Sequence, residues 1–246
     1  MRKLWFLLAV AAVAACATTP TPAVPAAPSR KAGPGCLEST TAAKHITFGD
    51  SKLVGIVLGK GTTGVVLAHQ NGGSVCQWLI TADELAQKGY LVLAFDFAGF
   101  GGSQVGTSAG RAADVAEAVK AIRAEGATKV ALAGGSMGGT AVVAAAATIT
   151  PPVQAVIALS APANFGGADA LSAAPKLTMP VLYMAAIGES TYTENAKAMH
   201  AASTASPDAQ LLVAKGSEHG VSVVMTGVGT DEAIKAFYSF LAKHML

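Results

Sequence analysis

Charged side chains are scarce in this sequence of 246 residues: 17 Lys and Arg and 15 Asp and Glu together make up 13% of it. The formal net charge is only +2, and Arg2 and Lys3 account for that whole excess. Such a balance gives the chain no electrostatic footprint for a nucleic acid or another polyanion. Apolar residues make up 52% of the sequence, so we expect a compact globule whose length suits one α/β domain.

Sequence motifs for metals and cofactors are also missing. There is no HExxH, no paired CxxC and no close cluster of His and Asp, so we expect neither a metal site nor a cofactor. Residues 59–64 do match GxGxxG, but a dinucleotide site needs a helix directly after this motif. An apolar, strand-like run follows here instead. We therefore interpret residues 59–64 as the turn of a β-hairpin.

The amino terminus has the features of an export signal. Residues 4–15 are apolar without interruption and follow two cations, and a run of this length is too short to span a bilayer. It ends in the letters VAAC at Cys16, which resemble the lipobox of bacterial lipoproteins. That resemblance implies a signal peptide over residues 1–15 and acyl chains such as palmitate on Cys16, which anchor a protein to a membrane. The alternative is an ordinary signal peptide cleaved near Ala17.

The next segment predicts a tether. Residues 16–35 are rich in Pro, Ala and Thr and leave little to bury, so the globular domain is expected over residues 36–246, at the periplasmic or extracellular face of a bacterial cell envelope. An oxidising compartment favours a disulfide between the two remaining cysteines, Cys36 and Cys76. In the chain-entropy model a loop of this size contributes about 4 kcal/mol. The alternative is two buried free thiols.

Short apolar runs alternate with helical patterns along the rest of the chain. We predict eight strands, at residues 45–48, 53–59, 65–69, 91–97, 129–134, 155–161, 181–186 and 210–215. Helical periodicity occurs at residues 74–89, 111–126, 140–149, 193–203 and 231–246. This alternation indicates a mostly parallel sheet with helices on both faces. No helix separates the first three strands, so we expect them to pair antiparallel at one edge.

One serine lies in a glycine-rich turn between a strand and a helix. Gly134, Ser136 and Gly138 form a GxSxG pattern after the strand at 129–134 and before the apolar run at 140–149. This context is typical of a nucleophile elbow, in which a strained turn lifts the serine hydroxyl above the sheet. Small residues two positions before and after the serine let the strand and the helix approach each other. Ser136 is therefore the candidate nucleophile.

From about residue 37 onward the chain resembles the α/β-hydrolase superfamily. The turn HQNGG after the strand at 65–69 resembles the turn that contributes to the oxyanion hole, which implies the backbone N–H groups of Gln70 and Met137 as donors. The resemblance also implies structural roles for His69 in this turn and for Asp96 in the turn that follows the strand at 91–97. Only 19 residues separate the sixth and seventh strands, too few for a substantial cap domain.

The general base of such a site is a histidine in the loop after the last strand. Of the five histidines only His219 occupies that loop. The acid departs from the superfamily pattern, because no Asp follows the seventh strand. Glu189 falls at that turn, Glu194 comes next in what we predict to be a helix, and Asp208 precedes the last strand. We favour Glu189, and a Ser–His dyad without an acid remains the alternative.

These residues predict a serine hydrolase of small or short-acyl carboxylic esters that acts through an acyl-enzyme. We expect the loops around this open site to carry Phe97, Phe100, Phe165, Tyr192 and Val221, which could line an apolar pocket or serve only for packing. An open site suits small soluble esters better than long-chain lipids. Acyl transfer or amide hydrolysis at the same site is an alternative, as is an inactive hydrolase fold used as a binding lipoprotein. We expect a monomer whose partners are its ester substrate and the membrane.

Overall fold

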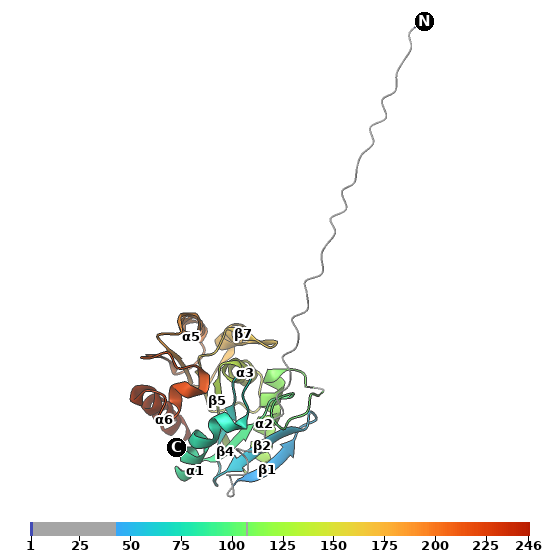
Figure 1. Cartoon of the computed structure of the whole chain (residues 1–246), viewed down its shortest axis with the longest axis vertical. Coiled ribbons are helices and arrows are strands. Elements are labelled where there is room, and N and C mark those ends of the chain that lie inside the picture. Colours follow the sequence, from blue (N-terminus) through green and yellow to red (C-terminus); the bar gives the residue numbers. More distant parts are fainter. Residues whose placement is uncertain (2–42, 107) are drawn as a thin grey trace.

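A computed structural model of the chain describes residue 1 and residues 43–106 and 108–246. Apart from residue 1, the predicted signal peptide lies outside these residues, as do the tether, Cys16 and Cys36, so the lipid anchor and the Cys36–Cys76 disulfide stay predictions. The described part forms one layer of sheet between two layers of helices (Figure 1). No helix in this part is both long and apolar enough to cross a membrane.

The main sheet has eight strands, as predicted. They are β1 (Lys44–Phe48), β2 (Leu53–Leu58), β3 (Thr63–Ala68), β4 (Leu91–Phe95), β5 (Lys129–Gly135), β6 (Ala155–Leu159), β9 (Val181–Ala186) and β10 (Ala209–Ala214). Their order in the sheet is β1-β2-β4-β3-β5-β6-β9-β10. In this order, all neighbouring strands from β4 onward pair parallel. β4 and β6 are buried along their whole length, as expected for parallel strands that are covered on both faces.

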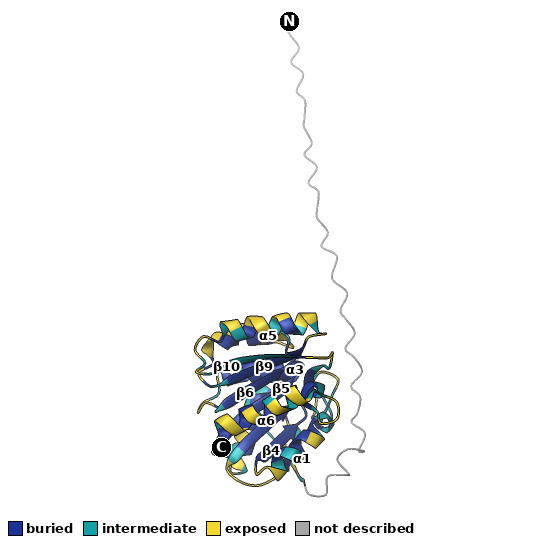
Figure 2. Ribbon diagram, turned by 90° about the vertical axis from the view of Figure 1, so that its left-hand side faces the viewer, coloured by how far each residue is buried: buried dark blue, intermediate teal, exposed yellow. Residues whose placement is uncertain are grey.

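Helices cover both faces of the sheet. They are α1 (Leu79–Gln87), α2 (Arg111–Ala124), α3 (Met137–Ala146), α4 (Ala170–Ala173), α5 (Ser190–Ala202) and α6 (Asp231–Met245). Buried residues of α1 and α6 share one core cluster, and those of α2, α3, α4 and α5 share the other. Figure 2 shows α6 crossing one face of the sheet with exposed residues outward. α6 begins where the Thr230 hydroxyl accepts the Ala233 N–H at 3.2 Å.

The edge of the sheet differs from the prediction. β1 pairs antiparallel with β2, as expected, but β2 and β3 do not pair, because β4 lies between them. Residues 59–62 therefore form a connection past the end of β4, residues 63 and 64 begin β3, and the predicted hairpin turn is wrong. Gly59 explains why this connection fits: its φ is +75°, and a Cβ there would lie 2.1 Å from the Tyr90 carbonyl oxygen.

The segment between β6 and β9 contains no cap domain. It consists of a small hairpin, β7 (Asn164–Phe165) with β8 (Ala168–Asp169), followed by α4 and a short 3-10 helix at Ala174–Lys176. Two further 3-10 helices, Val75–Trp78 and Gly220–Val224, follow the strands β3 and β10. The carboxyl ends of the parallel strands are therefore left accessible beside the β7–β8 hairpin.

Candidate active site

Ser136 lies at a sharp turn between β5 and α3. Its backbone has φ +49° and ψ −115°, a conformation that a non-glycine residue rarely adopts. The Ser136 N–H donates to the Leu159 carbonyl at 2.7 Å, which ties the turn to β6. A Cβ on Gly134 would lie 2.3 Å from the Gly138 oxygen, and one on Gly138 would lie 2.3 Å from the Ala68 oxygen. Both flanking glycines are thus needed for the close approach of the strand, the turn and the helix.

The loop after β10 brings His219 to this turn. A Cβ on Gly135 would lie 2.6 Å from the Val221 nitrogen, so the segment after His219 packs directly on the elbow. Gly220 has φ +59°, and a Cβ on it would lie 3.6 Å from the Ser136 Cβ. The residue next to His219 therefore lies against the candidate nucleophile, although the two are more than eighty positions apart in the sequence.

A carboxylate lies against the His219 ring on the Nδ1 side. Glu189 Oε1 is 2.5 Å from His219 Nδ1, and the Glu189 side chain is only 10% exposed. The Tyr192 ring packs on the imidazole with the ring centroids 4.5 Å apart. A short bond to an ionised acceptor in a poorly hydrated position orients the ring and leaves Nε2 available for another group.

Ser160 holds the second oxygen of this carboxylate, a role that sequence reasoning missed. Its hydroxyl donates to Glu189 Oε2 at 2.6 Å, and the residue is fully buried. Ser160 follows β6 with φ +44°, so its backbone is strained in the left-handed region. The only sequence signal is its position at the carboxyl end of a buried parallel strand.

The other two candidate acids are engaged elsewhere. Glu194 lies on the exposed face of α5 and pairs with Lys197 at 2.8 Å. Asp208 pairs with Lys243 at 2.7 Å and with His244 at 2.9 Å, and the hydrogen bond from Lys243 lowers the pKa of this carboxyl. Neither acid contacts His219. Of the three candidates considered, Glu189 is the one that the fold brings to the imidazole.

The turn after β3 differs from the expectation for Gln70. Its backbone N–H donates to Gln77 Oε1 at 3.2 Å, so this donor already has an acceptor within the chain. The Gln70 side chain instead accepts the Val221 N–H at 3.1 Å and links the turn to the His219 loop. The next residue, Asn71, lines a cavity together with Met137. Asn71, and not Gln70, is therefore the residue of this turn that faces the open space beside the elbow.

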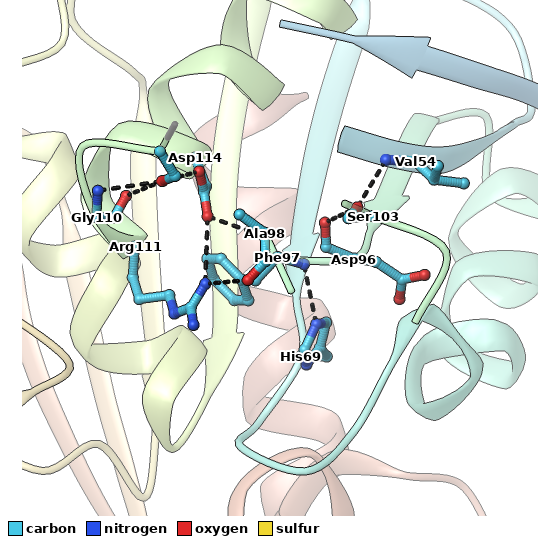
Figure 3. Close-up of polar contacts among 10 residues, drawn as sticks. Val54, His69, Asp96, Phe97, Ala98, Ser103, Gly110, Arg111 and Asp114 are labelled. Carbon is cyan, nitrogen blue, oxygen red and sulfur yellow. Dashed lines mark hydrogen bonds and ion pairs between the residues drawn. The ribbon is translucent and has the colours of Figure 1, made fainter. Parts of the chain in front are cut away.

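His69 is held in a structural role beneath this turn. The Phe97 N–H donates to His69 Nε2 at 3.1 Å (Figure 3), so Nδ1 carries the proton and donates to the Gln70 carbonyl at 2.8 Å. Burial lowers the pKa of His69 to about 4, against an opposing contribution from the bond to Gln70. Both ring nitrogens are occupied and the ring is neutral, so it is not available as a base.

Asp96 joins three segments of chain. Its carboxylate accepts the N–H groups of Val75 at 2.6 Å and Gly102 at 2.8 Å. Its carbonyl accepts the Ser103 hydroxyl at 2.6 Å (Figure 3). Burial raises the pKa of Asp96, while the two backbone donors oppose that rise. Because the carboxylate accepts hydrogen bonds from the backbone of two separate loops, it holds the segments at Val75 and Gly102 together beside the site.

A cavity of about 320 Å³ opens beside Met137. It is lined by Asn71, Ala98, Phe100, Val105, Gly106, Ser108, Gly110, Arg111, Met137, Phe165 and Gly166. Of the aromatic residues predicted to surround the site, Phe100 and Phe165 are therefore in its wall. Phe97 is buried in the core, and Tyr192 contacts His219 instead. No group of three or more potential metal ligands occurs within residues 43–106 and 108–246.

Comparison with known proteins identifies the family and the fold of the chain. A family model described as the alpha/beta hydrolase fold matches residues 64–186, which is half of the chain. An esterase from Pyrococcus furiosus superimposes with a TM-score of 0.74 at 17% identity, covering 89% of this chain and 97% of the esterase. The search of curated proteins finds no significant match.

Two further solved structures share the fold. An enol-lactonase from Burkholderia xenovorans has a TM-score of 0.65 and 15% identity, covering 81% of this chain and 100% of its own. A protein from a study of the carboxylesterases of Nitrososphaera gargenis has a TM-score of 0.66 and 14% identity, covering 81% of this chain and 98% of its own.

Proposed function

This chain belongs to the alpha/beta hydrolase fold family, and from that premise we propose that it is a serine hydrolase of small carboxylic esters. The observation that supports the proposal most is the contact between Glu189 and His219 at 2.5 Å, in a loop whose next residue packs against Ser136. Three different loops supply the strained Ser136, the imidazole of His219 and the carboxylate of Glu189. These three groups are the parts that acyl transfer to a hydroxyl requires.

In the proposed reaction the Ser136 hydroxyl attacks the ester carbonyl and His219 Nε2 takes its proton. Glu189 holds the imidazole in the tautomer that presents Nε2 to the serine and stabilises the imidazolium. The N–H of Met137, at the amino end of α3, and that of Asn71 receive the oxyanion, with Asn71 in the place first assigned to Gln70. His219 returns the proton to the leaving alcohol, and then activates the water that releases the acyl group.

The size and position of the cavity bear on the substrate. Its volume lies at the lower end of the range for ligand pockets, about 300–1,000 Å³. No cap domain covers the carboxyl ends of the strands in the described part of the chain. Both features favour small esters, or a short acyl group on a larger molecule, over long-chain lipids.

A fluorophosphonate probe tests the proposal. The purified domain is labelled, with Ser136→Ala as the variant and Ser217→Ala as the matched control, since Ser217 is an exposed serine in the same loop as His219. We expect wild type and Ser217→Ala to be labelled and to hydrolyse 4-nitrophenyl acetate and butyrate, and Ser136→Ala to do neither. An unlabelled, inactive wild type would leave only a binding module with the hydrolase fold.

We further propose that the chain is a lipoprotein anchored through Cys16, with a Cys36–Cys76 disulfide at the start of its domain. The support is the apolar run at residues 4–15 and the lipobox-like letters before Cys16. Expression in a bacterium with labelled palmitate tests the anchor: wild type should incorporate label and partition into detergent, and Cys16→Ser should not. Mass spectrometry of the unreduced domain tests the disulfide. A wild type without incorporated label would reject the anchor.

A further inference from the structure

The cavity beside the candidate nucleophile has one charged residue in its wall. Among the eleven described residues that line it, Arg111 is the only one with an ionisable side chain, and no Asp or Glu is present. The others are small, aromatic or neutral polar residues. Met137, whose N–H is a proposed oxyanion donor, lines the same cavity. A cationic residue therefore lines the cavity that we expect a bound ester to enter.

A backbone carbonyl and two aromatic rings contact the Arg111 guanidinium, whose carbon lies 5.6 Å from the centre of the Phe97 ring. The guanidinium Nη1 donates to the Ala98 carbonyl at 2.7 Å, and the guanidinium carbon lies 4.8 Å from the centre of the Phe100 ring. Figure 3 shows that the other terminal nitrogen points away from Ala98 and from Asp114. The guanidinium has five N–H donors in a fixed fork, and these contacts use only its Nη1 end.

The neighbouring carboxylate of Asp114 makes no close hydrogen bond to the Arg111 guanidinium. Asp114 is outside the cavity wall, with its side chain 2% exposed, and accepts the Ala98 N–H at 3.1 Å and the Ser108 hydroxyl at 2.5 Å. Its Oδ2 lies 3.5 Å from Arg111 Nη1, longer than a charge-assisted hydrogen bond. Arg111 still acts at a distance, because it contributes to the lowered pKa of His69.

We propose that Arg111 binds a carboxylate group of the substrate, so that the preferred esters of this enzyme are anionic. The proposal rests on the serine hydrolase function proposed above. A planar guanidinium stacked on an aromatic ring with free donors matches a carboxylate in two-point geometry. The amino end of the 14-residue helix α2, which begins at Arg111, adds its partial positive charge.

Two pairs of esters test the proposal, because the carboxylate belongs either to the acyl part or to the alcohol part. The acyl pair is mono-4-nitrophenyl adipate, which has a free carboxylate, and methyl 4-nitrophenyl adipate, in which that carboxylate is a methyl ester. The alcohol pair is 4-acetoxybenzoate and 4-acetoxybenzamide. In one pair we expect the anionic ester to have a kcat/KM about tenfold or more above that of its neutral partner, which is the range for a hydrogen bond to a charged group.

Variants then locate the preference. Arg111→Gln should reduce the ratio of the two kcat/KM values about tenfold, and a ratio measured in one protein cancels any loss of folded enzyme. Val105 is 84% exposed in the cavity wall, so Val105→Asp should fold normally and lower the ratio about threefold by repulsion. Val105→Asn is its uncharged control and should leave the ratio unchanged.

The outcomes separate the two proposals. Hydrolysis of the neutral esters without preference for the anionic ones in either pair overturns the carboxylate site and leaves the hydrolase intact. A ratio that stays the same in Arg111→Gln and in Val105→Asp overturns it as well. If wild type hydrolyses none of the four esters and resists the fluorophosphonate probe, both the site and the hydrolase are wrong.

Discussion

Replacing Glu189 by Gln should slow the proposed reaction by about 10² to 10⁴-fold, which corresponds to ~3–5 kcal/mol of transition-state stabilisation. The side chain keeps its shape but loses its charge at a contact of 2.5 Å with His219. The size of the loss depends on how the amide settles between its two partners. Ser160 donates to the second oxygen of the native carboxylate at 2.6 Å, and its hydroxyl can also accept a hydrogen bond.

Two orientations of the new amide set the two ends of this range. With the amide oxygen toward His219, Nδ1 keeps its proton and only the stabilisation of the imidazolium is lost. With the amide NH2 group toward His219, Nδ1 has to accept, Nε2 carries the proton, and the imidazole presents the wrong tautomer to Ser136. The second arrangement keeps the native bond from Ser160 to an oxygen.

The assay is the kcat/KM for 4-nitrophenyl butyrate, with active enzyme counted by fluorophosphonate titration and folding checked by thermal unfolding. Glu194→Gln is the matched control, since Glu194 pairs with Lys197 on the exposed side of α5, the helix that begins directly after Glu189. This variant should retain wild-type activity within about twofold. Retention of more than about a tenth of the activity by Glu189→Gln, or an equal loss in both variants, would refute the assignment of the acid.

Three further predictions use other parts of the site. Ser160→Gly should lower kcat/KM about tenfold, because the bond to Glu189 is lost while glycine adopts the φ of +44° without strain. If Ser160 acts through Glu189, the same substitution should cost less in the Glu189→Gln background, and an equal tenfold loss there would contradict this role. The folded-state pKa of His69 is depressed from 6.5 to about 4, so its contribution to stability is complete above pH 6.5 and is lost as pH falls toward 4. The loss is about 3 kcal/mol, and urea unfolding of wild type and His69→Gln should show a shallower pH dependence in the variant. Gly138→Ala should destabilise the domain by about 3 kcal/mol or prevent folding, because its Cβ would meet the Ala68 oxygen at 2.3 Å, whereas Gly106→Ala, with no atom nearer than 3.5 Å, should unfold like wild type.

Local patterns were sufficient for the fold class. Strands that are buried on both faces must be continuously apolar, and helices between them must carry a periodic apolar stripe, so all eight strands of the main sheet could be located to within two residues at each end. The turn at Ser136 could also be predicted, because close approach of a strand and a helix requires small residues at fixed positions around it. Each of these features depends on neighbours in the sequence.

The tertiary structure decided what distant segments share. A turn after β9 offers Glu189 and Glu194 five positions apart, and only the start of α5 at Ser190 places the first beside His219 and leaves the second in solvent. Tertiary structure likewise decided the partner of the Gln70 N–H, which donates to the side chain of Gln77.

Strand order was likewise beyond local reasoning. Pairing of β3 with β4 and β5, instead of with β2, depends on how all the strands bury their faces together. The amino-acid sequence specified the strands, the helices and the candidate nucleophile turn at Ser136, because backbone conformation and burial pattern are local properties. Only packing determined which acid contacts His219 and which residues line the cavity beside Met137, because both join residues that are far apart in the chain.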